Sequence, residues 1–123
     1  MSRKAFIDEL AVLGYVVEDR GENRIAFPYS VPVGKLRGQI VRIGLVVNDD
    51  VALNAPSGPH VSPRLFPLHS GNDLPHPQGG IHESPFGSEW QYWSRPFHAW
   101  KKTDRTAAAY MTHIRELFQR IKA

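Results

Sequence analysis

The stretch EWQYWSRPFHAW, residues 89–100, decides how the rest of the chain is interpreted. All three tryptophans lie in it, at positions 90, 93 and 100, with Tyr92 and Phe97 between them. Aromatic rings carry the largest hydrophobic area per residue, and a buried indole N–H usually has a hydrogen-bond partner. Two interpretations are open. The rings pin an irregular segment to the core, which the general burial of large aromatics favours, or they line a binding surface.

The composition predicts one folded domain spanning residues 1–123. Hydrophobic residues make up 41% of the chain and charged residues 22%, which is typical of a globular protein. The sequence has no cysteine, which excludes disulfides, zinc thiolates and thiol nucleophiles and is compatible with a cytoplasmic location. No apolar stretch predicts a signal peptide or a membrane span. The net charge of +3 is modest and does not indicate nucleic-acid binding.

Both ends of the chain predict helices. Apolar residues recur at helical spacing over residues 2–13, and Ser2 can cap this first helix. A second helix is predicted over residues 105–121, where one apolar stripe faces away from charged residues. Its N-cap is predicted to be Thr103 or Asp104, because hydroxyl and carboxylate oxygens accept hydrogen bonds from the first helical N–H groups.

The first half of the chain between the helices predicts an antiparallel meander of about four strands. Segments 15–19, 24–29 and 39–47 are rich in β-branched and aromatic residues, and the last two alternate between apolar and polar positions. A turn is predicted at 20–23 and a further short strand near 60–66. One face of this sheet is apolar enough to be covered by the first helix. The opposite face of segment 39–47 is mixed, which predicts partial cover.

Residues 55–96 have a different composition. They contain eight of the ten prolines, and five of the six histidines lie between His60 and His98. Irregular structure is therefore predicted over most of this segment. A loop of this length inside a small domain is usually functional, or it is pinned by its own side chains.

The histidines leave an enzyme open as an alternative, with or without a metal. No H-E-x-x-H motif or other metal-ligand spacing occurs, and no serine lies in a G-x-S-x-G elbow. We therefore predict no cofactor, no metal site and no catalytic residue. A metal would need ligands that only folding brings together, drawn from His60, His69, His76, His82, Asp73 and Glu83.

The order of elements resembles that of ubiquitin-conjugating enzymes: helix, antiparallel meander, proline-rich segment, tryptophan motif, helix. It is most similar to a prokaryotic branch of that superfamily, the conjugating-enzyme-like "family E" domain. The motif reads Trp90-Gln91-x-Trp93-Ser94-Arg95, then Trp100, then Asp104-Arg105-x-x-x-x-Tyr110. The segment Pro59–Pro63 resembles the region after the third strand of these enzymes, and His76-Pro77-Gln78 partly matches their His-Pro-Asn box. The resemblance implies an α+β, conjugating-enzyme-like fold over essentially the whole chain.

One departure limits what the resemblance implies. Conjugating enzymes carry ubiquitin as a thioester on a cysteine, expected here between His76 and Trp93, and this chain has none. A serine or tyrosine would form an ester and is a much poorer nucleophile at neutral pH. The resemblance therefore implies a non-catalytic binding or adaptor module in a bacterial ubiquitin-like protein system. The implied partners are a ubiquitin-like protein and an activating-enzyme-like protein, with a JAB-type peptidase as a further component.

The predicted partner-binding surface lies in the irregular half of the chain. Neither nucleic acid nor a membrane is an expected partner. Two enzymatic alternatives stay open. One is chemistry by the histidine-rich segment, and the other is a residue that replaces the cysteine as acceptor of a ubiquitin-like tail: a serine or tyrosine, through an ester, or a histidine. The residues predicted to contact the partner are His60, His76, His82, Trp90, Trp93, Arg95 and His98.

Overall fold

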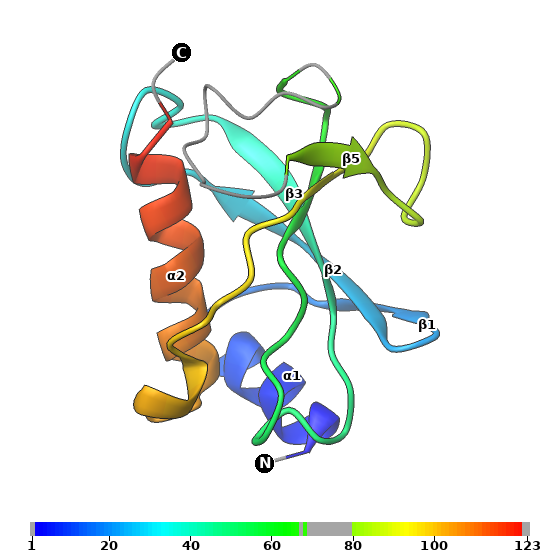
Figure 1. Cartoon of the computed structure of the whole chain (residues 1–123), viewed down its shortest axis with the longest axis vertical. Coiled ribbons are helices and arrows are strands. Elements are labelled where there is room, and N and C mark those ends of the chain that lie inside the picture. The colour runs from blue at the N-terminus through cyan, green and yellow to red at the C-terminus, as the bar shows by residue number, and fades with distance from the viewer. Residues whose placement is uncertain (1, 67, 69–79, 122–123) are drawn as a thin grey trace.

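The computed structural model describes residues 2–66, 68 and 80–121 and confirms an α+β fold (Figure 1). The helices are α1 Arg3–Val12 and α2 Ala107–Gln119, and a short 3₁₀ helix, η1 Trp100–Lys102, precedes α2. All strand pairs are antiparallel, in the order β1-β2-β3-β4-β6-β5. The strands are β1 Glu18–Gly21, β2 Arg24–Ser30, β3 Ile40–Val46, β4 His60–Ser62, β5 Ile81–Glu83 and β6 Gln91–Trp93.

A side-chain hydroxyl caps the N-terminal end of each α-helix. The hydroxyl of Ser2 accepts a hydrogen bond from the Ala5 N–H at 3.1 Å, which confirms the predicted cap of α1. The predicted cap of α2 is wrong, because Thr106 takes that role by accepting from the Ala109 N–H at 3.1 Å. Arg105 adopts a positive φ of 56°, a conformation that cannot continue back into a helix. The helix therefore starts after Arg105, later than predicted.

The meander begins later than predicted and is longer. The predicted turn at 20–23 is wrong in extent: Glu22 and Asn23 alone form it, with φ of 54° and 63°. Two residues with positive φ are the signature of a type I′ hairpin turn, which matches the twist of its flanking strands. The strand before it is therefore Glu18–Gly21 instead of the predicted 15–19. The strands predicted over 24–29 and 39–47 are confirmed as β2 and β3.

The segment predicted as irregular contributes more to the sheet than expected. The short strand predicted near 60–66 is confirmed as β4. Two more strands, β5 and β6, lie in the same proline-rich region, so the prediction of about four strands is wrong. Each is three residues long and is defined by the partner to which it pairs.

The main hydrophobic core lies between the sheet and the two helices. Figure 1 shows α2 lying along one side of the sheet, with its N-terminal end next to α1. The alternation in β2 directs Ile25 and Phe27 to this side, and Phe6 and Leu10 of α1 pack against the same core. We call this side of the sheet the helix face and the opposite side the outer face.

Gln91 explains why the tryptophan motif holds the long excursion in place. Its side chain is fully buried, and its amide oxygen accepts hydrogen bonds from Trp93 Nε1 at 3.0 Å and from the Leu65 N–H at 3.1 Å. The same oxygen accepts from the Phe66 N–H at 3.3 Å, and the amide nitrogen donates to the Phe66 carbonyl at 2.8 Å. One side chain thus fixes an indole and the backbone that follows β4.

The other indole of the core is anchored in the same manner. Trp100 is 2% exposed, and its Nε1 donates to the Val51 carbonyl at 2.8 Å. Tyr110 of α2 packs edge-on against Trp100 and donates from its hydroxyl to the Ser57 carbonyl. These contacts confirm the interpretation that aromatic rings pin the irregular segment to the core.

Candidate functional site

A row of side chains crosses the outer face from strand to strand. Ala26 is paired with Gly44, Gly44 with His60, His60 with Tyr92, and Tyr92 with His82. Because directly paired residues share a face of the sheet, all five lie on the outer face. The ring of Tyr92 lies 4.6 Å from that of His60 and 6.4 Å from that of His82. Strand pairing thus brings together three rings that are distant in the sequence.

The loop between β5 and β6 folds back over this row. Phe86 and Trp90 lie in it, are each 5% exposed, and form with Ala26 a second small hydrophobic cluster. The Phe86 ring lies 4.6 Å from the His60 ring and occupies the space above Gly44. A Cβ added to Gly44 would lie 2.7 Å from the Phe86 ring, so any larger residue at this position would force the ring to move.

Two arginines complete the surface. The guanidinium carbons of Arg20 and Arg42 each lie 5.5 Å from the Trp90 ring centre, within the range of a cation–π contact. Arg20 also donates to the Phe86 carbonyl at 3.3 Å. Glu18 lies between the two, 3.3 Å from Arg42 and 3.8 Å from Arg20. A hollow of about 330 Å³ is lined by Arg20, Arg42, Phe86 and Trp90 together with Gly87, Ser88 and Glu89 of the β5–β6 loop.

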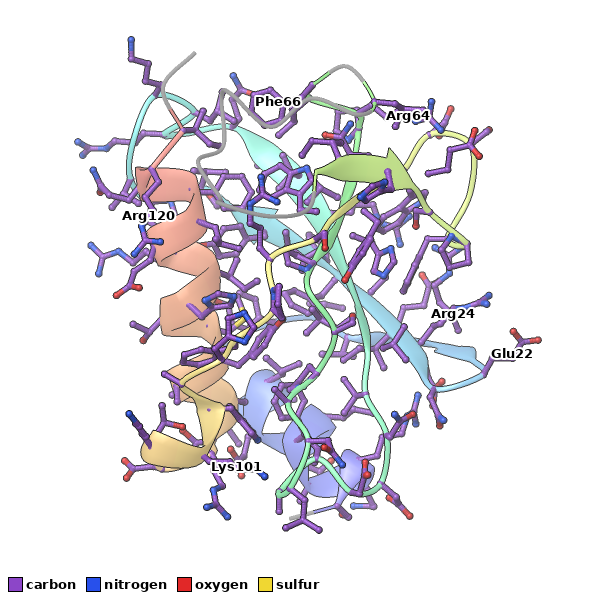
Figure 2. The ribbon with its side chains drawn as sticks, viewed as in Figure 1. Glu22, Arg24, Arg64, Phe66, Lys101 and Arg120 are labelled. Atoms are coloured by element: carbon purple, nitrogen blue, oxygen red, sulfur yellow. The ribbon has the colours of Figure 1, made fainter. Side chains whose placement is uncertain are left out.

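We define the outer-face patch by the residues that these contacts join. It carries aromatic rings, two histidines and two guanidinium groups, and it lies on the side of the sheet away from α2. In Figure 2, Arg24 of β2, the strand between β1 and β3, also lies on the side of the molecule away from α2. The outer-face patch consists of Arg20, Arg42, His60, His82, Phe86, Trp90 and Tyr92.

His60 of the patch lies next to a hydroxyl of the β5–β6 loop, Ser84, in an arrangement that resembles a nucleophile and its base. His60 Nδ1 lies 2.8 Å from Ser84 Oγ, which itself accepts from the Phe86 N–H at 3.0 Å. Burial, and secondarily the charge of Arg24, lowers the pKa of His60 to about 4. An imidazole with such a pKa is a weak base near neutral pH and is poorly suited to activate a hydroxyl. The contacts of Ser84 connect the β5–β6 loop to the sheet.

We expect the domain to lose stability on acidification because of His60. Its folded-state pKa lies below the unfolded-state value of about 6.5, so the unfolded chain binds the proton first. The stabilising contribution is present above about pH 6.5 and is lost as the pH falls toward 4. This amounts to about 2 kcal/mol between about pH 7.5 and pH 5. Urea denaturation at the two pH values measures it.

The His60→Gln variant is the comparison that isolates this residue. Burial also lowers the pKa of His113, so the parent protein has a second source of acid sensitivity. The variant is expected to lose most of the difference in unfolding free energy between the two pH values. An equal pH dependence in parent and variant would contradict the assignment.

The structure separates the residues predicted to bind a partner. His60, His82 and Trp90 lie together in the outer-face patch. Trp93 and Arg95 are 0% and 1% exposed, so their side chains lie in the interior of the fold.

The last two predicted residues fall elsewhere. His98 is exposed and lies in the segment that leads to η1, apart from the outer-face patch. His76 lies outside the described residues. The residues that sequence reasoning missed are Arg20, Arg42, Phe86 and Tyr92. The one usable signal was the mixed face of β3, where Arg42 and Gly44 alternate with core residues.

The described residues give little support to an enzyme that uses the histidine-rich segment. Among residues 2–66, 68 and 80–121, no group of three or more His, Cys, Asp or Glu side chains is placed to hold a metal ion. His69, Asp73 and His76 lie outside that range, so a metal site that includes them stays a prediction. No helix in the described part of the chain is long and apolar enough to cross a membrane.

Comparisons with protein-family models, curated proteins and solved structures found nothing that matches this chain. The resemblance carried by the tryptophan motif therefore stays a prediction. The outer-face patch is one feature of the described residues from which a function can be argued.

Proposed function

We propose that this chain is a non-catalytic, conjugating-enzyme-like binding module of a bacterial ubiquitin-like protein system. Its partner is the ubiquitin-like protein or the activating-enzyme-like protein, and a JAB-type peptidase is a further component. The outer-face patch is the observation that carries the proposal, because it offers a ready contact surface on a chain without a cysteine. The tryptophan motif and the helix–meander–helix order support the family part of the proposal.

The chemistry of the patch suits protein recognition. Tryptophan, tyrosine and arginine contribute most to binding energy at protein interfaces. Here Trp90 and both arginines line one hollow, and Tyr92 lies in the same patch. The side chain of Arg42 is 44% exposed, and Tyr92 is partly exposed. Glu18 neutralises the arginines in the free protein, and an acidic side chain of the partner can take its place. The patch therefore favours a partner with an acidic residue beside an apolar one.

The absence of a thiol supports a binding role over tag transfer. An ester on Ser84 is the second candidate, since this hydroxyl contacts His60 Nδ1 at 2.8 Å. The low pKa of His60, about 4, counts against it because the base would have little driving force to take the proton.

Titration of the ¹⁵N-labelled protein with the ubiquitin-like and the activating-enzyme-like proteins tests the proposal. We expect amide shifts to concentrate on the outer-face patch with one of the two. Arg42→Gln is expected to weaken that binding about tenfold, the loss of one charged contact at an interface centre. Arg120→Gln is the matched control, because Arg120 projects from α2 on the other side of the molecule (Figure 2).

Three results decide against the proposal or part of it. An absence of binding to either protein at tens of micromolar contradicts it, as does an equal loss in Arg42→Gln and Arg120→Gln. Mass spectrometry of the protein after incubation with the activated tag distinguishes the second candidate. An adduct that disappears in Ser84→Ala would establish ester transfer in place of simple binding.

A further inference from the structure

A second hollow lies on the helix face, apart from the outer-face patch. It has a volume of about 400 Å³ and is formed where the end of α1, the end of β2 and the flank of α2 meet. This volume is within the range of small-ligand sites in proteins. Partner binding by the outer-face patch and ligand binding in this hollow can be measured separately, because different residues form the two sites.

The walls of this hollow are mainly apolar. Leu13, Tyr15, Pro32 and Met111 line it. Leu13 is 48% exposed and also lines an adjoining apolar hollow of about 310 Å³, beside Val12, which is 87% exposed. Two exposed aliphatic side chains next to a concave apolar surface indicate a site for an apolar group.

One wall is polar and carries an unused donor. Tyr29 lines the hollow and is 4% exposed, and its Oη is buried with no hydrogen-bond partner among the described residues. Burial raises the pKa of Tyr29 to about 12, so the phenol stays protonated near neutral pH and keeps a proton to donate. A buried hydroxyl without a partner is costly, and an acceptor supplied by a ligand would remove that cost.

Arg115 supplies a positive charge at the same wall. It lies on the exposed flank of α2, lines the hollow, and is close enough to Tyr29 to affect the pKa of that phenol. Within the part of the chain that the structure describes, Arg115 makes no ion pair. A guanidinium group and a neutral phenol beside apolar walls are complementary to a carboxylate with an apolar body.

We infer that this hollow binds a small apolar carboxylate, with its anionic group held by Arg115 and Tyr29 and its apolar body held against Leu13 and Met111. A free organic acid and the C-terminal carboxylate of a peptide ending in an apolar residue share this chemistry. The inference does not depend on the proposed function, because none of these side chains belongs to the outer-face patch.

Two carboxylate probes and a neutral control test it. We expect 4-phenylbutyrate or N-acetyl-leucine to bind saturably in an NMR titration, with shifts at Tyr29, Met111 and Arg115. The alcohol 4-phenylbutanol is expected to bind about tenfold more weakly, the effect of losing one charge-assisted contact. Tighter binding of N-acetyl-leucine assigns the site to a chain end, and tighter binding of 4-phenylbutyrate assigns it to a free acid. Absence of shifts at these residues, or equal binding of the alcohol, overturns the inference.

Matched variants separate binding from folding. Tyr29→Phe keeps the ring in the core and removes the hydroxyl, so the free protein is expected to melt at the same or a higher temperature. Carboxylate affinity is expected to fall about tenfold in this variant and in Arg115→Gln. Arg120→Gln, at the C-cap of α2 and outside the hollow, is expected to bind like the parent. Parent-like binding by both Tyr29→Phe and Arg115→Gln overturns the inference.

Discussion

Replacing Trp93 with alanine is expected to lower the free energy of unfolding by about 3–5 kcal/mol, the usual cost of truncating a large buried ring. Trp93 is 0% exposed. Its ring lies 5.2 Å from Phe118 of α2 and 5.8 Å from Phe66 in the segment after β4. The truncation therefore leaves a cavity where the sheet, the second helix and the long excursion meet, and none of the three can close it alone.

Urea denaturation followed by circular dichroism measures this loss. Leu53→Ala is the control, because Leu53 is 62% exposed and its truncation is expected to change stability by less than about 0.5 kcal/mol. If Trp93→Ala unfolds at the same urea concentration as Leu53→Ala, Trp93 does not anchor the core. Trp93→Phe is expected to be intermediate, because it restores part of the buried ring.

The elements that sequence could predict are those with a long periodic pattern. Both helices show apolar residues at helical spacing, and β2 and β3 alternate over seven residues each. Even there, boundaries depended on single backbone conformations. The positive φ of Arg105 moved the start of α2, and the two-residue turn at Glu22 and Asn23 moved β1.

The strands that sequence could not predict are too short to show a pattern. β5 and β6 have three residues each, and three residues cannot distinguish alternation from chance. Their identity comes from pairing, since β6 inserts between β4 and β5 in the sheet. Proline-rich flanks concealed them further, because proline is typical of irregular structure.

The outer-face patch could not be predicted from the sequence, because it too depends on strand pairing. Its central row depends on the register of β3 with β4 and of β4 with β6. A shift by one residue would move His60 and Tyr92 to opposite faces. The histidines and tryptophans that stood out by composition therefore divide between two environments: Trp90 and His60 lie on the outer face, and Trp93 lies in the core.

Replacing Gln91 with leucine is expected to destabilise the protein by about 3 kcal/mol, although leucine is apolar and of similar volume. The loss arises because leucine cannot form the hydrogen bonds of the Gln91 amide, while the partners of that amide stay buried. Trp93 Nε1 and the backbone groups of Leu65 and Phe66 would stay in the interior without the amide that satisfies them. In Figure 2, Phe66 and Arg64 lie at the end of the molecule where β5 lies, and this end would loosen first.

Hydrogen exchange distinguishes this cause from a general loss of packing. The amides of Leu65 and Phe66 are expected to lose protection in Gln91→Leu, while the amides of α1 keep theirs relative to the reduced global stability. Gln119→Leu is the matched control, since Gln119 is exposed on α2 and its replacement is expected to be nearly neutral. Unchanged protection at Leu65 and Phe66 would mean that the aromatic rings hold the excursion without the amide. The glutamine of the tryptophan motif would then have no structural role, and a role in partner recognition would be the better explanation for it.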